Sequence, residues 1–386
     1  MPLTDTFVRF ARSEQFSGVL LLACTAVSLL LANSPAADAY LALWQVRIGP
    51  MTLGYWINDA LMAVFFLFIG LELERELYEG ELSSPRNALL PVFAAVGGMA
   101  APALIHLGLN GGTATQAGFG IPMATDIAFA LGVLALLGNR IPGALKVFVV
   151  AFAVIDDLGA IVVIAGAYTA ELSPLNLALA LTTFAGLVFM NRPLRVMPLW
   201  PYLLGGVMLW HFVHEAGIHA SIAGVLLAFA IPFTSRDSHT ASPSARLEHG
   251  LHKPVAYIIL PLFALANTGI PLDSAAITGL SSDNSLGIML GLLLGKPLGV
   301  LLLCVIAVRL GVSALPEGVN WRQVAGAGML GGIGFTMSIF ITNLAFTGDE
   351  FLINVSKLAV LCASLLAGIL GYLWLRATPI RTANSN

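Results

Sequence analysis

The chain has 386 residues, of which 58% are hydrophobic and only 10% are charged. A soluble domain carries roughly 25% charged residues, so this composition indicates a protein whose surface faces lipid. The formal net charge of −3 is too small to indicate nucleic acid as a partner. The three cysteines lie in apolar runs without disulfide or metal-ligand spacing, so we expect them to serve packing.

Apolar segments long enough to cross a bilayer, about 20 residues each, follow one another along the chain. We predict twelve spans, at residues 16–33, 57–78, 86–108, 114–137, 144–169, 174–190, 200–213, 216–232, 249–269, 285–308, 321–345 and 351–375. Short connections rich in Pro, Gly, Asn and Ser separate them, which leaves no room for a soluble domain. The sequence therefore predicts one all-α, polytopic membrane domain over residues 1–386.

The basic residues test this count independently. With a cytoplasmic N-terminus, Arg47 and Lys357 fall on or near the external side, and Lys296 lies within a span. The other 15 of the 18 Lys and Arg residues fall on the cytoplasmic side: Arg9, Arg12, Arg75, Arg86, Arg140, Lys146, Arg192, Arg195, Arg236, Arg246, Lys253, Arg309, Arg322, Arg376 and Arg381. Cytoplasmic loops carry an excess of such residues, so we predict that both termini are cytoplasmic.

Four charged residues lie near the middle of predicted spans: Asp126, Asp156, Asp157 and Lys296. Each costs roughly 2.5–3.5 kcal/mol at the bilayer centre, and one lysine cannot neutralise three carboxylates. At least one carboxylate must therefore titrate or meet an external cation. Neighbouring residues on a helix point about 100° apart, so Asp156 and Asp157 cannot share one direction. One of them can face Lys296 while the other faces a water-filled cavity.

The fourth and eleventh spans contain predicted breaks. In the fourth, Pro122 lacks an N–H, and Thr125 and Asp126 are good N-caps for a helix that restarts after them. In the eleventh, a glycine cluster precedes Phe335: Gly326, Gly328, Gly331, Gly332 and Gly334. Glycines also allow close packing of membrane helices, so this cluster alone leaves both interpretations open.

The positions of the two breaks favour a functional interpretation. Spans 3–5 and spans 10–12 form triplets that cross the membrane in opposite senses, and in each the middle span is the interrupted one. This layout is typical of secondary transporters with inverted-topology repeats, whose binding site lies at the broken helices. Half-helix N-termini carry partial positive charge and C-termini partial negative charge. Asp126 could compensate the former and Lys296 the latter.

Six segments together resemble the NhaA-type bacterial Na⁺/H⁺ antiporters, and the resemblance runs from the first span to the last. They are Phe-Phe-Leu-Phe-Ile-Gly-Leu-Glu at 65–72, Ala-Thr-Asp-Ile-Ala-Phe-Ala at 124–130, Ile-Asp-Asp-Leu-Gly-Ala at 155–160, Gly-Ile-His-Ala at 217–220, Gly-Lys-Pro-Leu-Gly at 295–299 and Gly-Ile-Gly-Phe-Thr-Met-Ser-Ile-Phe at 332–340. Inverted repeats are already known for this family.

The resemblance implies two broken helices that cross at mid-membrane. It also implies a core bundle of spans 3–5 and 10–12, an interface bundle from the remaining spans, and a homodimer in the bacterial inner membrane. The implied activity is electrogenic exchange of cytoplasmic Na⁺ or Li⁺ for external protons, without a cofactor. The family's cation-site aspartate matches Asp157, with Thr125 and Asp126 nearby, and the partner of its membrane lysine, here Lys296, matches Asp156.

A mechanism follows from competition at Asp157. Burial favours the uncharged form of a carboxyl group, so this side chain would hold either a proton or Na⁺ and not both. Oxygen ligands such as carboxylate, hydroxyl and carbonyl groups suit a hard cation. A second proton could be carried by Asp156 or by Lys296, because a close pair titrates as a unit. The sequence leaves that choice open.

Two charged groups mark predicted helix ends on the cytoplasmic side. Glu72, Arg75 and Glu76 share one helix face, and Glu248, His249 and His252 open the ninth span. A solvated helix end is one interpretation, whereas the resemblance implies that both groups sense pH, since histidine titrates near neutrality. His219 lies in the matched 217–220 segment and is a candidate regulatory residue.

The chain departs from the family pattern at two positions near this group. Ala245 stands where the family often has lysine, and Glu74 stands where a basic residue is common. The pH at which exchange begins is therefore left open by the sequence.

Three other functions use some of the same features. An intramembrane aspartyl protease would place its two aspartates on different helices, and a cation channel would use symmetric rings of ligands. A Na⁺-coupled symporter of a small solute would need more polar or aromatic recognition groups, and it is the main alternative. The sequence has no paired-histidine zinc motif and no nucleophile–base set, so we expect a transporter and not an enzyme.

Overall fold

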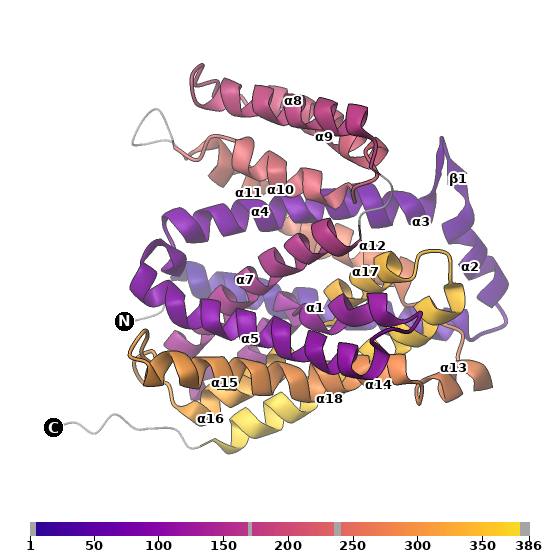
Figure 1. Cartoon of the computed structure of the whole chain (residues 1–386), viewed down its shortest axis with the longest axis vertical. Coiled ribbons are helices and arrows are strands. Elements are labelled where there is room, and N and C mark those ends of the chain that lie inside the picture. The colour runs from indigo at the N-terminus through magenta and orange to yellow at the C-terminus, as the bar shows by residue number, and fades with distance from the viewer. Residues whose placement is uncertain (1–4, 169–171, 235–240, 379–386) are drawn as a thin grey trace. The chain divides into compact units, whose positions relative to one another are not determined.

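The computed structural model describes residues 5–168, 172–234 and 241–378 (Figure 1). Seven helices of these residues are long and apolar enough to cross a membrane, or nine if each of two bent helix pairs counts as one span. The described residues contain one short antiparallel hairpin, β1 (Arg47–Ile48) with β2 (Met51–Thr52). The predicted all-α, polytopic membrane architecture is confirmed.

The predicted spans at 200–213, 216–232 and 249–269 correspond to helices that are shorter than the about 20 residues needed to cross a bilayer. The first lies in α9 (Trp200–Glu215), and the second contains only the ten residues of α10 (Ser221–Ala230). The third is divided among α11 (Pro243–Pro254), the π-helical turn η5 (Val255–Ile259) and α12 (Leu260–Asn267). Length alone therefore does not identify these three segments as spans.

The chain folds into two compact units, and the first comprises residues 1–33, 84–160 and 267–386. It holds the predicted spans 3–5 and 10–12 together with the first span. Its elements are α1 (Asp5–Ala32), α5 (Pro85–Asn110), η3 (Gln116–Met123), α6 (Ile127–Leu136), η4 (Gly138–Arg140), most of α7 (Gly143–Ala167), α13 (Ser274–Gly279), α14 (Asp283–Leu290), η6 (Gly291–Gly295), α15 (Lys296–Arg309), α16 (Trp321–Gly331), α17 (Phe335–Ala345) and α18 (Glu350–Ala377).

The second unit comprises residues 34–83 and 161–266. Besides β1, β2, α9, α10, α11, η5 and most of α12, it contains α2 (Ala37–Gln45), α3 (Leu53–Trp56), η1 (Ile57–Leu61), α4 (Met62–Tyr78), η2 (Glu81–Ser83), the end of α7 and α8 (Pro174–Asn191). Its apolar core lies among α4, α8, α9 and α10, where Leu71, Tyr202 and Leu209 are completely buried.

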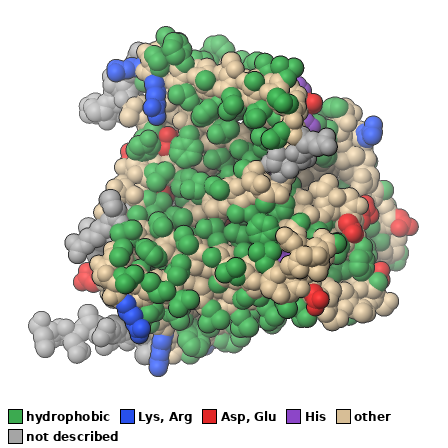
Figure 2. All heavy atoms as spheres, in the orientation of Figure 1, with side chains coloured by type: hydrophobic (Ala, Val, Ile, Leu, Met, Phe, Trp, Pro, Cys, Tyr) green, Lys and Arg blue, Asp and Glu red, His purple; other side chains and the backbone are tan. Residues whose placement is uncertain are grey.

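The outer faces of α8 and α9, which lie side by side in Figure 1, carry large exposed hydrophobic side chains. Leu175 is 70% exposed on α8, and Trp200 and Val207 are 66% and 64% exposed on α9. Figure 2 shows hydrophobic side chains over much of the visible face, with charged side chains at its margins. Such a surface suits contact with lipid.

In the first unit, α5 and α15 approach closely at two glycines. A Cβ atom on Gly97 would collide with the carbonyl of Gly299, and one on Gly299 would collide with the carbonyl of Gly97. Small residues let membrane helices approach in this way. The contact lies one turn from Lys296, the first residue of α15, and so helps to position the site.

Both predicted breaks are present in the first unit. After η3, residues 124–126 are not helical, and α6 begins at Ile127 with Asp126 as its N-cap. The eleventh span divides into α16 and α17, whose axes differ by 46°. The glycines between them therefore belong to a true interruption and not only to close helix packing.

Candidate functional site

The two interrupted segments of the first unit lie against each other and bond each other's free backbone groups. The Asp126 N–H donates to the carbonyl of Ile333 at 2.6 Å, and the Thr125 hydroxyl donates to the carbonyl of Gly331 at 2.9 Å. The Ser338 hydroxyl donates to the carbonyl of Ile121 at 2.6 Å. Irregular backbone is tolerated at membrane depth where protein groups satisfy it, and these bonds do so for both breaks.

Asp126 joins the beginnings of two half-helices. Its Oδ1 accepts from the Phe129 N–H at 3.2 Å in α6. Its Oδ2 accepts from the N–H and the hydroxyl of Thr336 at 3.2 and 2.5 Å in α17. Helix N-termini carry partial positive charge, so one buried carboxylate balances two of them. Thr336 is a candidate site residue that the sequence did not indicate by itself, although it lies in the matched 332–340 segment.

Lys296 and Asp156 form a fully buried ion pair. Their Nζ and Oδ2 atoms are 2.7 Å apart, and both side chains are 0% exposed. The Lys296 ammonium also donates to the carbonyl of Met123, the last residue of η3. A helix C-terminus carries partial negative charge, so Lys296 compensates both a carboxylate and a half-helix end. The Phe152 ring lies 5.9 Å from the same ammonium.

Asp157 follows Asp156 on α7 and has different surroundings. It is 2% exposed, its charge acts on Lys296, and Asp156 rather than Asp157 forms the ion pair. Thr125, which is 0% exposed, lies beside the Asp156 carboxyl. The first unit thus holds the four charged residues that the sequence places at mid-membrane, Asp126, Asp156, Asp157 and Lys296, together with Thr125.

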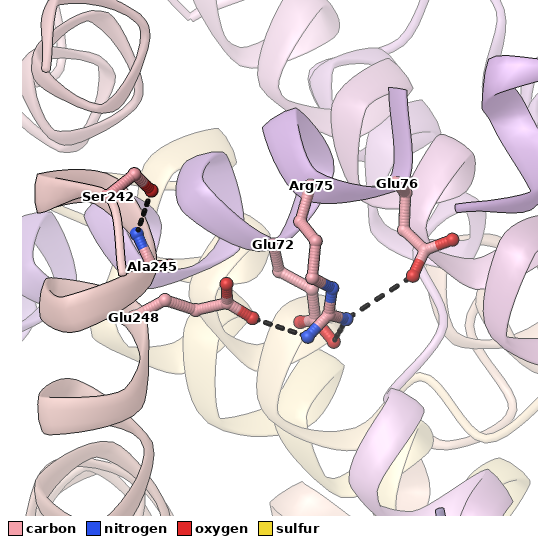
Figure 3. A network of polar contacts seen from close by, with 6 residues as sticks. All are labelled: Glu72, Arg75, Glu76, Ser242, Ala245 and Glu248. Atoms are coloured by element: carbon pink, nitrogen blue, oxygen red, sulfur yellow. Dashed lines mark hydrogen bonds and ion pairs between the residues drawn. The ribbon is translucent and has the colours of Figure 1, made fainter. Parts of the chain in front are cut away.

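A second charged cluster lies in the second unit, with Arg75 at its centre (Figure 3). The guanidinium is 2.6 Å from Glu248 Oε1 on α11, 3.3 Å from Glu76 Oε1 and 3.6 Å from Glu72 Oε1. Burial raises the pKa of the Glu248 carboxyl, and the Arg75 charge opposes this shift in part. One cation thus faces three carboxylates from α4 and α11.

The histidines of this region take different positions. His252 is close enough to act electrostatically on Glu248, and its ring lies 5.9 Å from that of Phe68. His249 is exposed on α11. The His219 Nδ1 lies 2.8 Å from the Ser221 hydroxyl at the start of α10.

Glu74 is an additional acidic residue beside this cluster. It is 4% exposed, and its Oε2 accepts from the Ser244 hydroxyl at 2.9 Å in the first turn of α11. Ser242 caps that turn by accepting from the Ala245 N–H at 3.1 Å, as Figure 3 shows. The two departures from the family pattern, Glu74 and Ala245, therefore fall where α4 meets the beginning of α11.

Comparison with known proteins places this chain in a family. The model of the family described as Na⁺/H⁺ antiporter 1 matches residues 8–375. A relative from Dechloromonas aromatica, named Na⁺/H⁺ antiporter NhaA, is 61% identical over 373 residues, which cover 97% of this chain and 96% of the relative.

Two further relatives carry similar names. The Na⁺/H⁺ antiporter NhaA of Flavobacterium psychrophilum is 55% identical and covers 97% of both chains. The Na⁺/H⁺ antiporter NhaA 1 of Flavobacterium johnsoniae is 53% identical over 386 residues, with both chains covered completely. This chain therefore belongs to the Na⁺/H⁺ antiporter 1 family of multi-pass membrane transporters.

Proposed function

We propose that this chain exports cytoplasmic Na⁺ or Li⁺ in electrogenic exchange for external protons, and that Asp157 binds Na⁺ and H⁺ alternately. The observation that supports this most directly is the buried Lys296–Asp156 ion pair, which has a second buried carboxylate beside it where the broken helices meet. Because Lys296 already pairs with Asp156, a proton or a cation must balance the negative charge of Asp157.

Competition for Asp157 couples the two ions. When Na⁺ binds from the cytoplasm, the proton leaves, because one carboxylate cannot keep both. Thr125 and Asp156 supply further oxygen ligands, which suit a hard cation. Asp126 contributes its negative charge to the site while it holds the beginnings of α6 and α17.

A second proton makes the exchange electrogenic. The Lys296–Asp156 pair can carry it, because two strongly interacting groups titrate as one unit. Return of the pair and Asp157 to their protonated states at the external side then completes the cycle.

The remaining predictions concern orientation, assembly and regulation. Both termini lie in the cytoplasm, as the distribution of Lys and Arg favours, and the second unit forms the interface of a homodimer. The Arg75 cluster with Glu72, Glu76 and Glu248 senses cytoplasmic pH, assisted by His249 and His252. The contact of His219 with Ser221 lies in the same unit, and His219 modulates this response.

A transport assay in proteoliposomes tests the function. A pH gradient across the vesicle membrane should collapse when Na⁺ or Li⁺ is added to the outer solution and should persist with K⁺. Reversing the sign of an imposed membrane potential should change the rate of exchange, because the exchange moves net charge. Na⁺ uptake that requires an organic solute and leaves the pH gradient intact would favour the Na⁺-coupled symporter instead, and Na⁺ current without proton movement would indicate a channel.

A further inference from the structure

Lys357 is a second buried lysine that the exchange mechanism does not use. It lies on α18 and is 8% exposed. An ammonium group in a membrane helix is costly, and such groups usually have a partner or a function. Lys296 meets this requirement through a carboxylate at 2.7 Å. The contacts of Lys357 are of another kind.

Three side chains from separate elements meet at one oxygen atom. The Lys357 Nζ donates to the Asn267 Oδ1 at 3.3 Å, and the Asn343 amide donates to the same Oδ1 at 2.7 Å. Asn267 is the last residue of α12 within the first unit, and Asn343 lies in the last turn of α17. The bonds therefore connect α17 to α18 through a single amide oxygen.

The ion pairs of the described residues do not include Lys357. Acidic residues of α13 and α18 are engaged at helix ends: Asp273 accepts from the Ala276 N–H in α13, and Asp349 accepts from the Leu352 N–H in α18. Asp283 begins α14, and Glu350 begins α18. His106 of α5 reaches Ser356 only through Asn284. A bond from a cation to a neutral amide is weaker than an ion pair, so this connection can break more readily than Lys296–Asp156.

The same short helix reaches the ion site at its other end. Thr336 in the first turn of α17 holds Asp126, and Asn343 lies seven residues later. At 1.5 Å per residue the two contacts are about 10 Å apart along the helix. A change in how the last turn is held therefore acts on a rigid element that touches Asp126.

We propose that Lys357, Asn267 and Asn343 form a latch that holds α17 and keeps the external side of the ion site closed. The assignment of the external side rests on the orientation in the proposed function. An amide oxygen holds an ammonium less strongly than a carboxylate does, so this connection permits release during each cycle. Lys357 and Asn343 are positioning residues in this scheme, since they act through α17.

The latch predicts an effect on one side of the membrane. In this scheme the outward-open state is a minor population of the wild-type protein. Weakening the latch raises that population severalfold, and apparent affinity scales with the fraction of the competent state. The external Na⁺ concentration for half-maximal exchange should fall, whereas the cytoplasmic value should change little because the inward-open state stays abundant.

Exchange measured in right-side-out and everted membrane vesicles tests this directly. Lys357→Met and Asn343→Leu should each lower the external half-saturating Na⁺ concentration by about fivefold, within the usual range of coupling between sites. Lys357→Arg keeps the cation and should show the wild-type external half-saturating Na⁺ concentration. Asn267→Asp supplies a carboxylate, so it should raise the external value and slow the exchange. Arg376→Met, which removes an exposed cation from the other end of α18, is the matched control.

The outcomes separate the latch from the function on which it rests. Absence of Na⁺-driven proton movement in wild-type vesicles of both orientations would overturn the exchanger itself. With a working wild type, equal changes on both sides in Lys357→Met, or no opposite effect of Asn267→Asp, would overturn the latch. An Asn343→Leu variant with the wild-type external half-saturating Na⁺ concentration would also contradict the latch. That substitution removes the bond from α17 to Asn267 and leaves the charge of Lys357 in place.

Discussion

Lys296 contacts two negative groups at once, the Asp156 carboxylate and the carbonyl at the end of η3. Because both partners of the ion pair are inaccessible to water, neither can be removed without leaving a buried charge. Breaking a buried pair in this way costs about 3–5 kcal/mol, whereas replacing both partners by apolar groups is often neutral.

This contrast predicts the stability of three variants in detergent. Lys296→Met should lower the Tm by several degrees at neutral pH, and the double variant Lys296→Met with Asp156→Leu should recover most of the loss. Lys296→Arg keeps the charge and serves as the control. Thermal unfolding followed by circular dichroism checks the result. Additive losses in the double variant would contradict the description of Lys296 and Asp156 as a coupled pair.

Glu248 gives a prediction for pH. Burial raises the pKa of this carboxyl, Arg75 and His252 lower it, and Glu76 and Glu79 raise it further. As the pH rises through the raised pKa, Glu248 ionises and its ion pair with Arg75 forms. The Glu248→Gln side chain stays neutral and imitates the protonated Glu248 present at low pH. The pH at which exchange begins should therefore rise in this variant.

Exchange rates measured from pH 6 to 9 would show this shift. Glu215→Gln, which alters an exposed carboxylate of the second unit that is not among the groups acting on Glu248, is the control. An unchanged pH profile of exchange for Glu248→Gln would show that the Arg75 cluster does not regulate exchange by pH.

At the scale of elements, the contact of α5 with α15 determines where Lys296 lies. Gly97 and Gly299 each face the other's backbone carbonyl, so a methyl group at either position must separate the helices. Backbone cannot yield as a flexible side chain does, and overpacking of this kind costs typically 1–3 kcal/mol.

Gly299→Ala should therefore lower both the Tm and the rate of exchange, because it displaces the beginning of α15. Gly108→Ala is the matched control on α5, since a Cβ atom there meets nothing within 4 Å. Thermal unfolding and proteoliposome exchange measure the two effects. A Gly299→Ala protein with wild-type stability and activity would show that the helices have room to move apart.

At the scale of the whole molecule, the sequence predicts local features of the fold better than partnerships. Pro122 and the glycine cluster before Phe335 indicate breaks because they act on the backbone at their own positions. The contacts of Met123 with Lys296 and of Thr336 with Asp126 depend on how two distant segments cross. Spacing along the chain does not specify that crossing.

The two adjacent aspartates show the same division. Helical spacing predicts that Asp156 and Asp157 point in different directions, but it does not say which one meets Lys296. That assignment came from family resemblance, and the geometry pairs Lys296 with Asp156. The boundaries of α9 to α11 also do not follow from the sequence, because these helices pack within the core of the second unit.

In the proposed exchange Na⁺ and H⁺ compete for Asp157, and proton release on Na⁺ binding tests this competition most directly. Purified wild-type protein in weakly buffered detergent solution should release protons when Na⁺ is added and none when K⁺ is added. Asp157→Asn should fold with a Tm near that of wild type and release no protons. Proton release of wild-type size from a folded Asp157→Asn protein would contradict the account.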